Sequence, residues 1–345
     1  MKILVTGAAG FIGNRMMQAL ANRGDDVVGI DNINDYYDPI FKCDRLRQCG
    51  ICKDNCKFEE GETVRSELLE NCRFIRMSID DKARLDRLFE HERFEKVVNL
   101  AAQAGVRHSI THPYDYLKSN LIGFLNILEA CRNYGVKHLV FASSSSVYGM
   151  NEKVPFSEDD KVCTPVSLYA ATKLSNEHMA YSYAKLYGLS TTALRFFTVY
   201  GPWGRPDMAP MLFANALRDD RPIKVFNHGD MLRDFTYIDD VVEGTLCAID
   251  QRPDAVNYEH GVPHVVYNIG CSSPVKLMDF IKEMEIAYGK SFQKEFMPMQ
   301  PGDVYQTYAD TTRLQEECGY TPHISLHEGI QRFITWHKEY YSNKR

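Results

Sequence analysis

The sequence predicts an α/β fold with a doubly wound, mainly parallel sheet, followed by a smaller C-terminal lobe. Two observations carry this prediction. Short apolar runs alternate with stretches of helical length over the first 195 residues. Most of the runs are continuously apolar, as in parallel strands that are covered on both faces. This alternation of strand and helix is typical of a doubly wound sheet.

Five strands are expected first, over residues 2–6, 26–30, 74–77, 96–100 and 138–142. Helices are expected over 13–23, 82–92, 119–134 and 167–187, and later over 275–288 and 324–341. The polar, cysteine-containing stretch 36–71 interrupts the rhythm and exceeds a plain connection in length. We interpret it as a partly helical insertion that decorates the surface, with a lid or an oligomer contact as the alternative.

A glycine-rich turn links the first strand to the first helix. Gly7, Gly10 and Gly13 are spaced so that the turn is tight and backbone amides can approach a pyrophosphate at the helix N-terminus. Asp31 follows the second strand, 24 residues after Gly7, where a ribose-binding acid belongs. A carboxylate accepts hydrogen bonds from ribose hydroxyls and repels a 2′-phosphate, so the sequence predicts NAD and not NADP.

A second cluster predicts redox chemistry on a hydroxyl group. A run of four serines, which includes Ser144, ends the apolar strand 138–142, and Tyr169 and Lys173 follow 25 and 29 residues after Ser144. Residues four apart share a helix face, so the lysine lies beside the tyrosine. A neighbouring cation lowers the pKa of a phenol from ~10, which suits Tyr169 to act as a base.

Composition excludes several other classes of protein. The 345 residues carry a net charge of −6, so no nucleic-acid partner is expected. No apolar stretch approaches the ~18 to 20 residues of a membrane helix, and the N-terminus does not resemble a signal peptide. We expect a cytoplasmic protein whose ten cysteines are reduced thiols, with no metal. A zinc site at Cys49, Cys52 and Cys56 is the less favoured alternative.

The character of the chain changes after Arg195, where prolines and aromatic residues become dense. We therefore expect an NAD-binding Rossmann domain over 1–195, with the insertion 36–71. Residues 196–345 should form mainly a substrate-binding lobe, and about 235–270 should return to the sheet.

With these motifs, the chain resembles the extended short-chain dehydrogenase/reductases that act on nucleotide sugars, and most closely the UDP-glucuronate 4-epimerases. The resemblance runs over nearly the whole length. It rests on the Gly7 turn, the serine run and Tyr169–Lys173, together with the motifs at 31–38, 99–107, 119–123, 195–208, 233–240 and 300–304.

The resemblance implies a role for individual residues. Ser144, Tyr169 and Lys173 are the catalytic residues. Thr198 and Arg205 face a hexuronate carboxylate, and Arg233 holds the substrate diphosphate. The remaining cofactor contacts, beyond Tyr169 and Lys173, are implied at Gly7, Gly10, Phe11, Ile12, Gly13, Asp31, Asn32, Ile79, Leu100, Ala101 and Ala102, and further substrate contacts at Ser145, Ser146 and Asp303.

The implied reaction is NAD-dependent 4-epimerisation of UDP-glucuronate through a 4-keto sugar, with the NAD tightly bound and recycled. By the same resemblance we expect a homodimer formed through the helices at 109–134 and 167–187. Two positions depart from the family: Ser78 stands where relatives have an adenine-contacting aspartate, and Asn99 where many have histidine.

Three alternatives stay open. A 4-epimerase for neutral UDP-hexoses is the nearest, although its relatives usually have asparagine at the position of Thr198. Nucleotide-sugar dehydratases and decarboxylases place acidic residues after the catalytic hydroxyl, where this chain has Ser145 and Ser146. A non-catalytic NAD-sensing protein would usually have lost the tyrosine or the lysine.

Overall fold

The computed structural model describes residues 1–256, 259–300 and 303–342, and its centre is an eight-stranded sheet. The strand order is β11-β7-β6-β5-β1-β2-β4-β3, and all neighbours are parallel except β3, which pairs antiparallel with β4. The strands are β1 (Lys2–Thr6), β2 (Asp26–Asp31), β3 (Thr63–Arg65), β4 (Cys72–Arg76), β5 (Lys96–Asn99), β6 (His138–Ser144), β7 (Thr191–Phe196) and β11 (His264–Ile269). The predicted doubly wound fold is confirmed.

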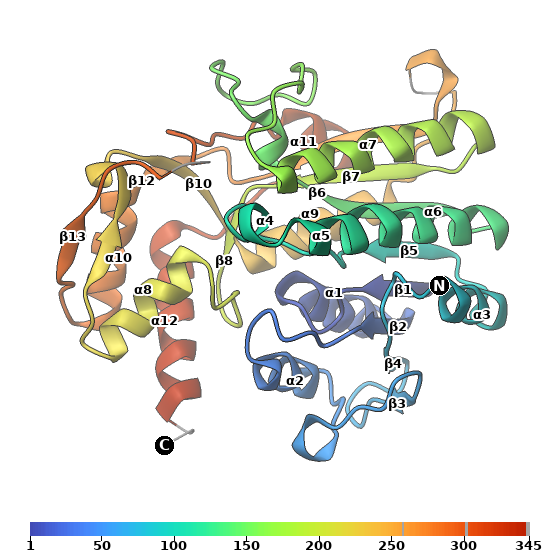
Figure 1. Ribbon diagram of the computed structural model, residues 1–345, viewed down its shortest axis with the longest axis horizontal. Helices are drawn as coiled ribbons and strands as arrows, with labels where there is room; N and C mark the ends of the chain where they lie inside the picture. The colour runs from blue at the N-terminus through green and yellow to red at the C-terminus, as the bar shows by residue number, and fades with distance from the viewer. Residues whose placement is uncertain (257–258, 301–302, 343–345) are drawn as a thin grey trace.

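Helices cover both faces of this sheet (Figure 1). Along β1, Ile3 and Val5 point into the core on the side of α1 and α9, whereas Leu4 points into the core on the opposite side. This alternation explains the continuously apolar strands. One face carries α3 (Lys82–Glu92), α6 (Gly123–Asn133) and α7 (Leu168–Tyr187), and the other α1 (Phe11–Asn22), α9 (Ile238–Asp250) and α11 (Thr312–Cys318).

The helix predicted over 119–134 is less regular than expected. It begins as α4 (His108–Thr111) and α5 (Pro113–Tyr116), continues as a π-helical segment η2 (Leu117–Ile122), and only then becomes α6. The buried Asn120 lies in the π-helical segment, and its side chain bonds the backbone of Gln103 and the hydroxyl of Thr172. Such segments are often found at functional sites.

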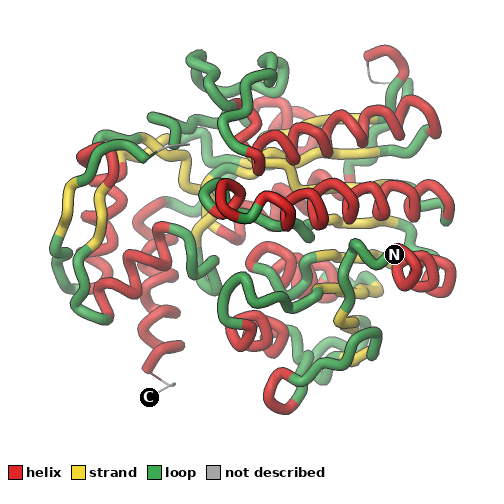
Figure 2. The backbone as a smooth tube through the Cα atoms, viewed as in Figure 1, coloured by secondary structure: helices red, strands yellow, loops and turns green. Residues whose placement is uncertain are grey.

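A smaller lobe lies beside the large sheet (Figure 2). The chain enters this lobe directly after the carboxyl end of β7. Its strands form the sheets β12-β10-β8 and β13-β9. The lobe comprises β8 (Thr198–Tyr200), α8 (Ala209–Arg218), β9 (Ile223–Val225), β10 (Leu232–Tyr237), β12 (Pro274–Lys276), α10 (Leu277–Tyr288), β13 (Lys294–Phe296) and α12 (Leu326–Ser342). Between the two lobes the chain crosses repeatedly, since β11 pairs with β7.

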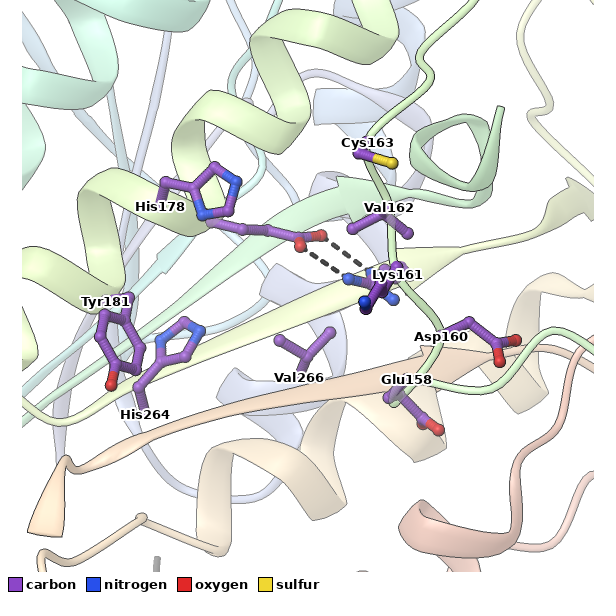
Figure 3. A pocket seen from close by; sticks show the side chains of 11 residues that line it. Glu158, Asp160, Lys161, Val162, Cys163, His178, Tyr181, His264 and Val266 are labelled. Atoms are coloured by element: carbon purple, nitrogen blue, oxygen red, sulfur yellow. Dashed lines mark hydrogen bonds and ion pairs between the residues drawn. The ribbon is translucent and has the colours of Figure 1, made fainter. Parts of the chain in front are cut away.

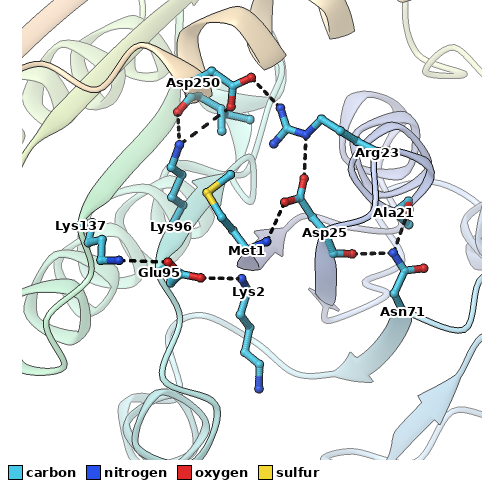
Figure 4. A network of polar contacts seen from close by, with 11 residues as sticks. Met1, Lys2, Ala21, Arg23, Asp25, Asn71, Glu95, Lys96, Lys137 and Asp250 are labelled. Carbon is cyan, nitrogen blue, oxygen red and sulfur yellow. Dashed lines mark hydrogen bonds and ion pairs between the residues drawn. The ribbon is translucent and has the colours of Figure 1, made fainter.

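The amino edge of the large sheet is fastened by polar contacts (Figure 4). The N-terminal ammonium of Met1 lies 3.0 Å from Asp25, and Arg23 bridges Asp25 and Asp250 at 2.7 Å each. Asn71 donates to the carbonyl oxygens of Ala21 and Asp25. Partly exposed pairs of this kind contribute about 1 kcal/mol or less each, but together they join β1, β2 and α9 at the edge away from the cleft.

The insertion 36–71 folds as α2 (Pro39–Gln48), a 3₁₀ turn (Asp54–Cys56) and the edge strand β3. A disulfide joins Cys43 to Cys56 across a Cα–Cα distance of 5.9 Å. The expectation that all cysteines are reduced is therefore wrong for this pair, because the turn brings the Cα atoms of two residues 13 apart in the sequence to a separation that a disulfide can span. The other eight cysteines are free, and no group of possible metal ligands in the described part of the chain includes a cysteine.

The described residues contain no helix that is both long and apolar enough to span a membrane.

Candidate active site

The glycine turn is too tightly packed to accept side chains. Gly7 has a φ of +69°, and its carbonyl accepts a hydrogen bond from the Gly10 amide at 2.9 Å. A Cβ atom built on Gly13 would lie 2.0 Å from the Gly7 oxygen. The first turn of α1 therefore lies directly on the end of β1, and its free amides open into the cleft. This arrangement suits a pyrophosphate.

Asp31 ends β2 with its carboxylate fixed at the same cleft. One oxygen accepts from the Ala9 amide at 3.2 Å and the other from the Ile33 amide at 2.8 Å. The hydrogen bond from Ala9 holds the Asp31 carboxylate beside the glycine turn, where it can bind the hydroxyls of a ribose. Ser78 also lines the cleft, and its hydroxyl donates to Asp80, which forms an ion pair with Lys118 instead of lining the cleft itself.

A single cleft of about 370 Å³ collects most of the predicted site. Its lining includes every predicted cofactor residue and all of the predicted catalytic residues, with Ser145, Ser146, Thr198 and Arg205. Gln103 also lines it, and the Gln103 Nε2 atom is buried without a hydrogen-bond partner among the described residues. This amide nitrogen is therefore available to donate a hydrogen bond to a polar group in the cleft.

The catalytic candidates meet where β6 ends and α7 begins. Ser167 caps α7 by accepting from the Ala170 amide at 3.1 Å, which places Tyr169 in the first turn and Lys173 in the next. The Lys173 ammonium donates to the Ala142 carbonyl at 2.8 Å and lies 6.0 Å from the centre of the Tyr169 ring. The Ser144 hydroxyl lies at the strand end and donates to Ser146 at 3.0 Å.

The charges around Tyr169 differ from the expectation in one respect. Burial raises the pKa of the Tyr169 phenol, while a hydrogen bond with Ser144 and the positive charge of Arg205 lower it. Lys173 was expected to supply the lowering charge, but its ammonium points to the end of β6. Burial lowers the pKa of Lys173 to about 8, and the negative charge of Glu177 opposes that fall.

A buried ion pair stabilises the junction between β6 and α7. Glu177, one turn after Lys173, accepts from two nitrogens of Arg195 on β7 at 3.0 and 2.8 Å. The pair lines a pocket whose other side chains include His178 and His264, which Figure 3 shows. Glu177 also accepts from the Ser143 hydroxyl at 2.5 Å. Arg195 and Glu177 are only 3 % and 6 % exposed at their side chains, so the pair is shielded from water.

Arg205 and Thr198 line the substrate end of the cleft. Arg205 forms an ion pair with Asp207, whose carboxylate also accepts from the Tyr36 hydroxyl at 2.9 Å. Burial lowers the pKa of Arg205, but the Asp207 charge outweighs it and holds the pKa above its ordinary value. No local pattern in the sequence indicates this contact, because Tyr36 and Asp207 are 171 residues apart.

Arg233 and Asp303 do not line this cleft. Arg233 lies on β10 and donates to the carbonyl oxygens of Val304 and Tyr305 at 2.7 and 3.0 Å. Asp303 lies 3.4 Å from Arg107. Pro301 and Gly302, which precede Asp303 in its motif, lie outside the described residues.

The insertion contributes to the cleft, so its interpretation as surface decoration is wrong. Tyr36, Tyr37 and Lys42 line the cleft, together with Asn34 just before the insertion. Lys42 donates to the Asn34 carbonyl at 2.9 Å, and burial lowers the pKa of its ammonium. The signal in the sequence was the motif at 31–38, whose aromatic residues fold back over the end of β2.

The sequence profile of the NAD dependent epimerase/dehydratase family matches residues 3–270. The chain belongs to this family.

Several relatives in this NAD dependent epimerase/dehydratase family match along almost the whole chain. Protein CapI of Staphylococcus aureus is 47 % identical over 351 residues, which cover 99 % of both proteins. UDP-glucuronate 4-epimerase 4 of Arabidopsis thaliana is 43 % identical over 352 residues, which cover 99 % of this chain and 76 % of the relative. A solved structure of UDP-glucuronic acid 4-epimerase from Bacillus cereus, with UDP-glucuronic acid and NAD, is 34 % identical with a TM-score of 0.85, covering 99 % and 100 % of the two chains.

The fixed carboxylate of Asp31 leads to a prediction about cofactor choice in this family member. Asp31→Asn should weaken NAD binding about tenfold, since a hydrogen bond to a charged group contributes about 1.5–3 kcal/mol. It should also reduce discrimination against NADP, because the repulsive charge is removed. Titration calorimetry on cofactor-free protein measures both affinities. Asp35→Asn, an exposed acid on the same loop, is the matched control, and an unchanged NAD to NADP ratio for Asp31→Asn would contradict the assignment.

Proposed function

We propose that this chain converts UDP-glucuronate to UDP-galacturonate by 4-epimerisation, with NAD retained and regenerated. The observation that carries the proposal is one cleft that holds three sets of groups: a dinucleotide cradle at Gly7 and Asp31, a Ser144–Tyr169–Lys173 cluster, and Arg205 beside Thr198. Relatives named UDP-glucuronate 4-epimerase, which match nearly all of this chain, support the choice of substrate.

The residues at the β6–α7 junction move the proton. Tyr169 removes the proton from the sugar 4-hydroxyl and later returns it, while the Ser144 hydroxyl bridges the reacting oxygen and the phenol. Bound NAD supplies the hydride acceptor and then the donor. Arg205 favours the phenolate by its charge, and Lys173 is held against the Ala142 carbonyl, where it can bind the nicotinamide ribose.

The configuration at C4 can invert only if the 4-keto sugar rotates between the two hydride transfers, so that its other face meets the cofactor. The diphosphate must therefore stay anchored while the sugar rotates. We assign that anchor to Arg233, a cation that lies outside the catalytic cleft on the smaller lobe. This division leaves the cleft itself free for the rotating sugar.

Arg205 and Thr198 give the cleft its preference for an acidic sugar. A sugar carboxylate needs a cation and a hydroxyl donor to replace its water, and both are present. The 4-keto uronate is a β-keto acid that can lose CO2, and we propose that the firm hold of Arg205 restrains this loss. Ser145 and Ser146 occupy the places where dehydratases and decarboxylases carry acids, and serine cannot do that acid–base work.

The function is tested most simply by incubation of the purified protein with UDP-glucuronate and no added NAD. UDP-galacturonate should form without CO2 or net NADH. Tyr169→Phe should lower kcat by about 10²–10⁴, the usual contribution of a positioned acid–base group, while Tyr288→Phe in the smaller lobe should have no effect. Turnover of UDP-glucose but not of UDP-glucuronate would overturn the proposal.

We also propose that the protein is a cytoplasmic homodimer that pairs through α6 and α7. These helices lie side by side on one face of the molecule (Figure 1). This face and its approach through α4 and α5 expose large apolar side chains at Ile110, Tyr114, Leu117, Ile122, Leu125, Tyr181, Leu186 and Tyr187. Apolar patches of this kind mark contacts between proteins.

Leu125→Arg should convert the dimer to a monomer, because two related copies would each bury an unpaired cation at the contact. Light scattering coupled to size-exclusion chromatography measures the mass. Leu212→Arg, which places the same charge on the exposed side of α8, should leave the dimer intact. A monomeric parent protein at micromolar concentration would contradict the assignment.

A further inference from the structure

Arg45 is a buried cation without an acidic partner. It lies on α2 in the insertion and is 0 % exposed. Among the described residues no carboxylate lies within ion-pair distance of its guanidinium. A buried charge is costly unless other groups compensate for it, so the contacts that replace water around Arg45 indicate what this side chain is for.

Backbone carbonyls and aromatic rings provide that compensation. The Nε and Nη2 atoms of Arg45 both donate to the Trp203 carbonyl, at 3.0 and 2.8 Å, and Nη2 also reaches the Gly204 carbonyl at 3.2 Å. Nη1 donates to the Ala9 carbonyl at 3.2 Å. The guanidinium lies 4.6 Å from the centre of the Phe41 ring, a distance at which the ring face attracts a cation.

These contacts join two parts of the site that are far apart in the sequence. Ala9 belongs to the glycine turn of the cofactor cradle, and Trp203 and Gly204 directly precede Arg205. Trp203 has a φ of +66°, a conformation that residues other than glycine seldom adopt. The guanidinium of Arg45 holds the Trp203 carbonyl by two hydrogen bonds. The centre of the Trp203 ring lies 5.1 Å from that of Trp336 and 4.8 Å from that of Tyr340.

We propose that Arg45 is a positioning residue for substrate recognition. By holding the backbone at 203–204, it sets the direction in which Arg205 enters the cleft, and it fixes that loop relative to the glycine turn. The insertion thus determines how firmly the enzyme holds an acidic sugar. This proposal rests on the proposed function, in which Arg205 contacts the carboxylate of UDP-glucuronate.

Arg45→Lys is the informative substitution. Lysine keeps the charge, but a compact ammonium cannot reproduce the planar fork that binds three carbonyls. The loop then loses its alignment, and the affinity for UDP-glucuronate should fall about tenfold. The affinity for UDP should change less than twofold, because UDP has no sugar carboxylate for Arg205 to contact. A general loss of folded structure would lower both affinities alike.

Calorimetric titration of the NAD-loaded protein with UDP-glucuronate and with UDP tests the proposal. The set comprises the parent protein, Arg45→Lys, Arg205→Lys and the double variant, with Arg47→Lys on the exposed side of the same helix as the control. If Arg45 acts through Arg205, Arg45→Lys should have little further effect once Arg205 is changed. Additive losses in the double variant, or equal losses for UDP, would overturn the proposal.

Tyr37→Phe tests the proposal a second time and leaves Arg45 itself unchanged. The Tyr37 hydroxyl accepts from Arg45 Nη1 at 2.5 Å, so its removal should weaken UDP-glucuronate binding two- to threefold and leave UDP unchanged. If both Arg45→Lys and Tyr37→Phe bind UDP-glucuronate like the parent, the proposal is wrong. A parent protein that does not bind UDP-glucuronate more tightly than UDP would instead refute the proposed function.

Discussion

The buried ion pair between Glu177 and Arg195 is the interaction on which the catalytic site depends. It joins three elements: α7 carries Glu177, β7 carries Arg195, and the end of β6 carries Ser143, which donates to Glu177. Ser143 and Arg195 face each other in the register of β6 and β7. Removal of one partner from such a pair typically costs 3–5 kcal/mol, so the pair holds the junction in one arrangement.

That arrangement determines what the neighbouring residues can do. Ser144 follows Ser143 directly, and Lys173 lies one turn before Glu177, so the pair orients both sides of the Tyr169 phenol. The negative charge of Glu177 also keeps the pKa of Lys173 from falling further on burial. On the other side of the cleft, Arg205 depends on Asp207 in a similar way. Arg195 and Arg205 are thus each held in place by a carboxylate.

Much of this could be predicted from the sequence, because local chemistry decided it. The glycine spacing, the acid after the second strand and the four-residue interval from Tyr169 to Lys173 each have a direct physical reading. Their places in the fold follow from the large sheet, whose parallel strands all end at one edge. The boundaries of α1, α3 and α7 were close to those expected. Apolar residues recur at helical spacing in α1 and α3, and the side chains of Asp81 and Ser167 cap the N-termini of α3 and α7.

What could not be predicted depends on contacts between distant segments. Nothing local shows that Tyr36 meets Asp207, or that Arg45 binds the carbonyl oxygens of Trp203 and Gly204. The insertion was read as decoration because its composition is polar, yet its helix buries Phe41, Lys42 and Arg45, and Lys42 lines the cleft. The Cys43–Cys56 bond was missed for the same reason, since spacing alone does not reveal which thiols approach each other.

We propose that the hydride leaves C4 and returns to C4 of the same sugar within one cleft. UDP-glucuronate with deuterium at C4 tests this directly, with mass spectrometry and NMR of the product. We expect UDP-galacturonate that keeps the deuterium at C4, with none lost to water and none transferred to unlabelled sugar in a mixture. Product in which the C4 deuterium has exchanged with solvent would contradict it.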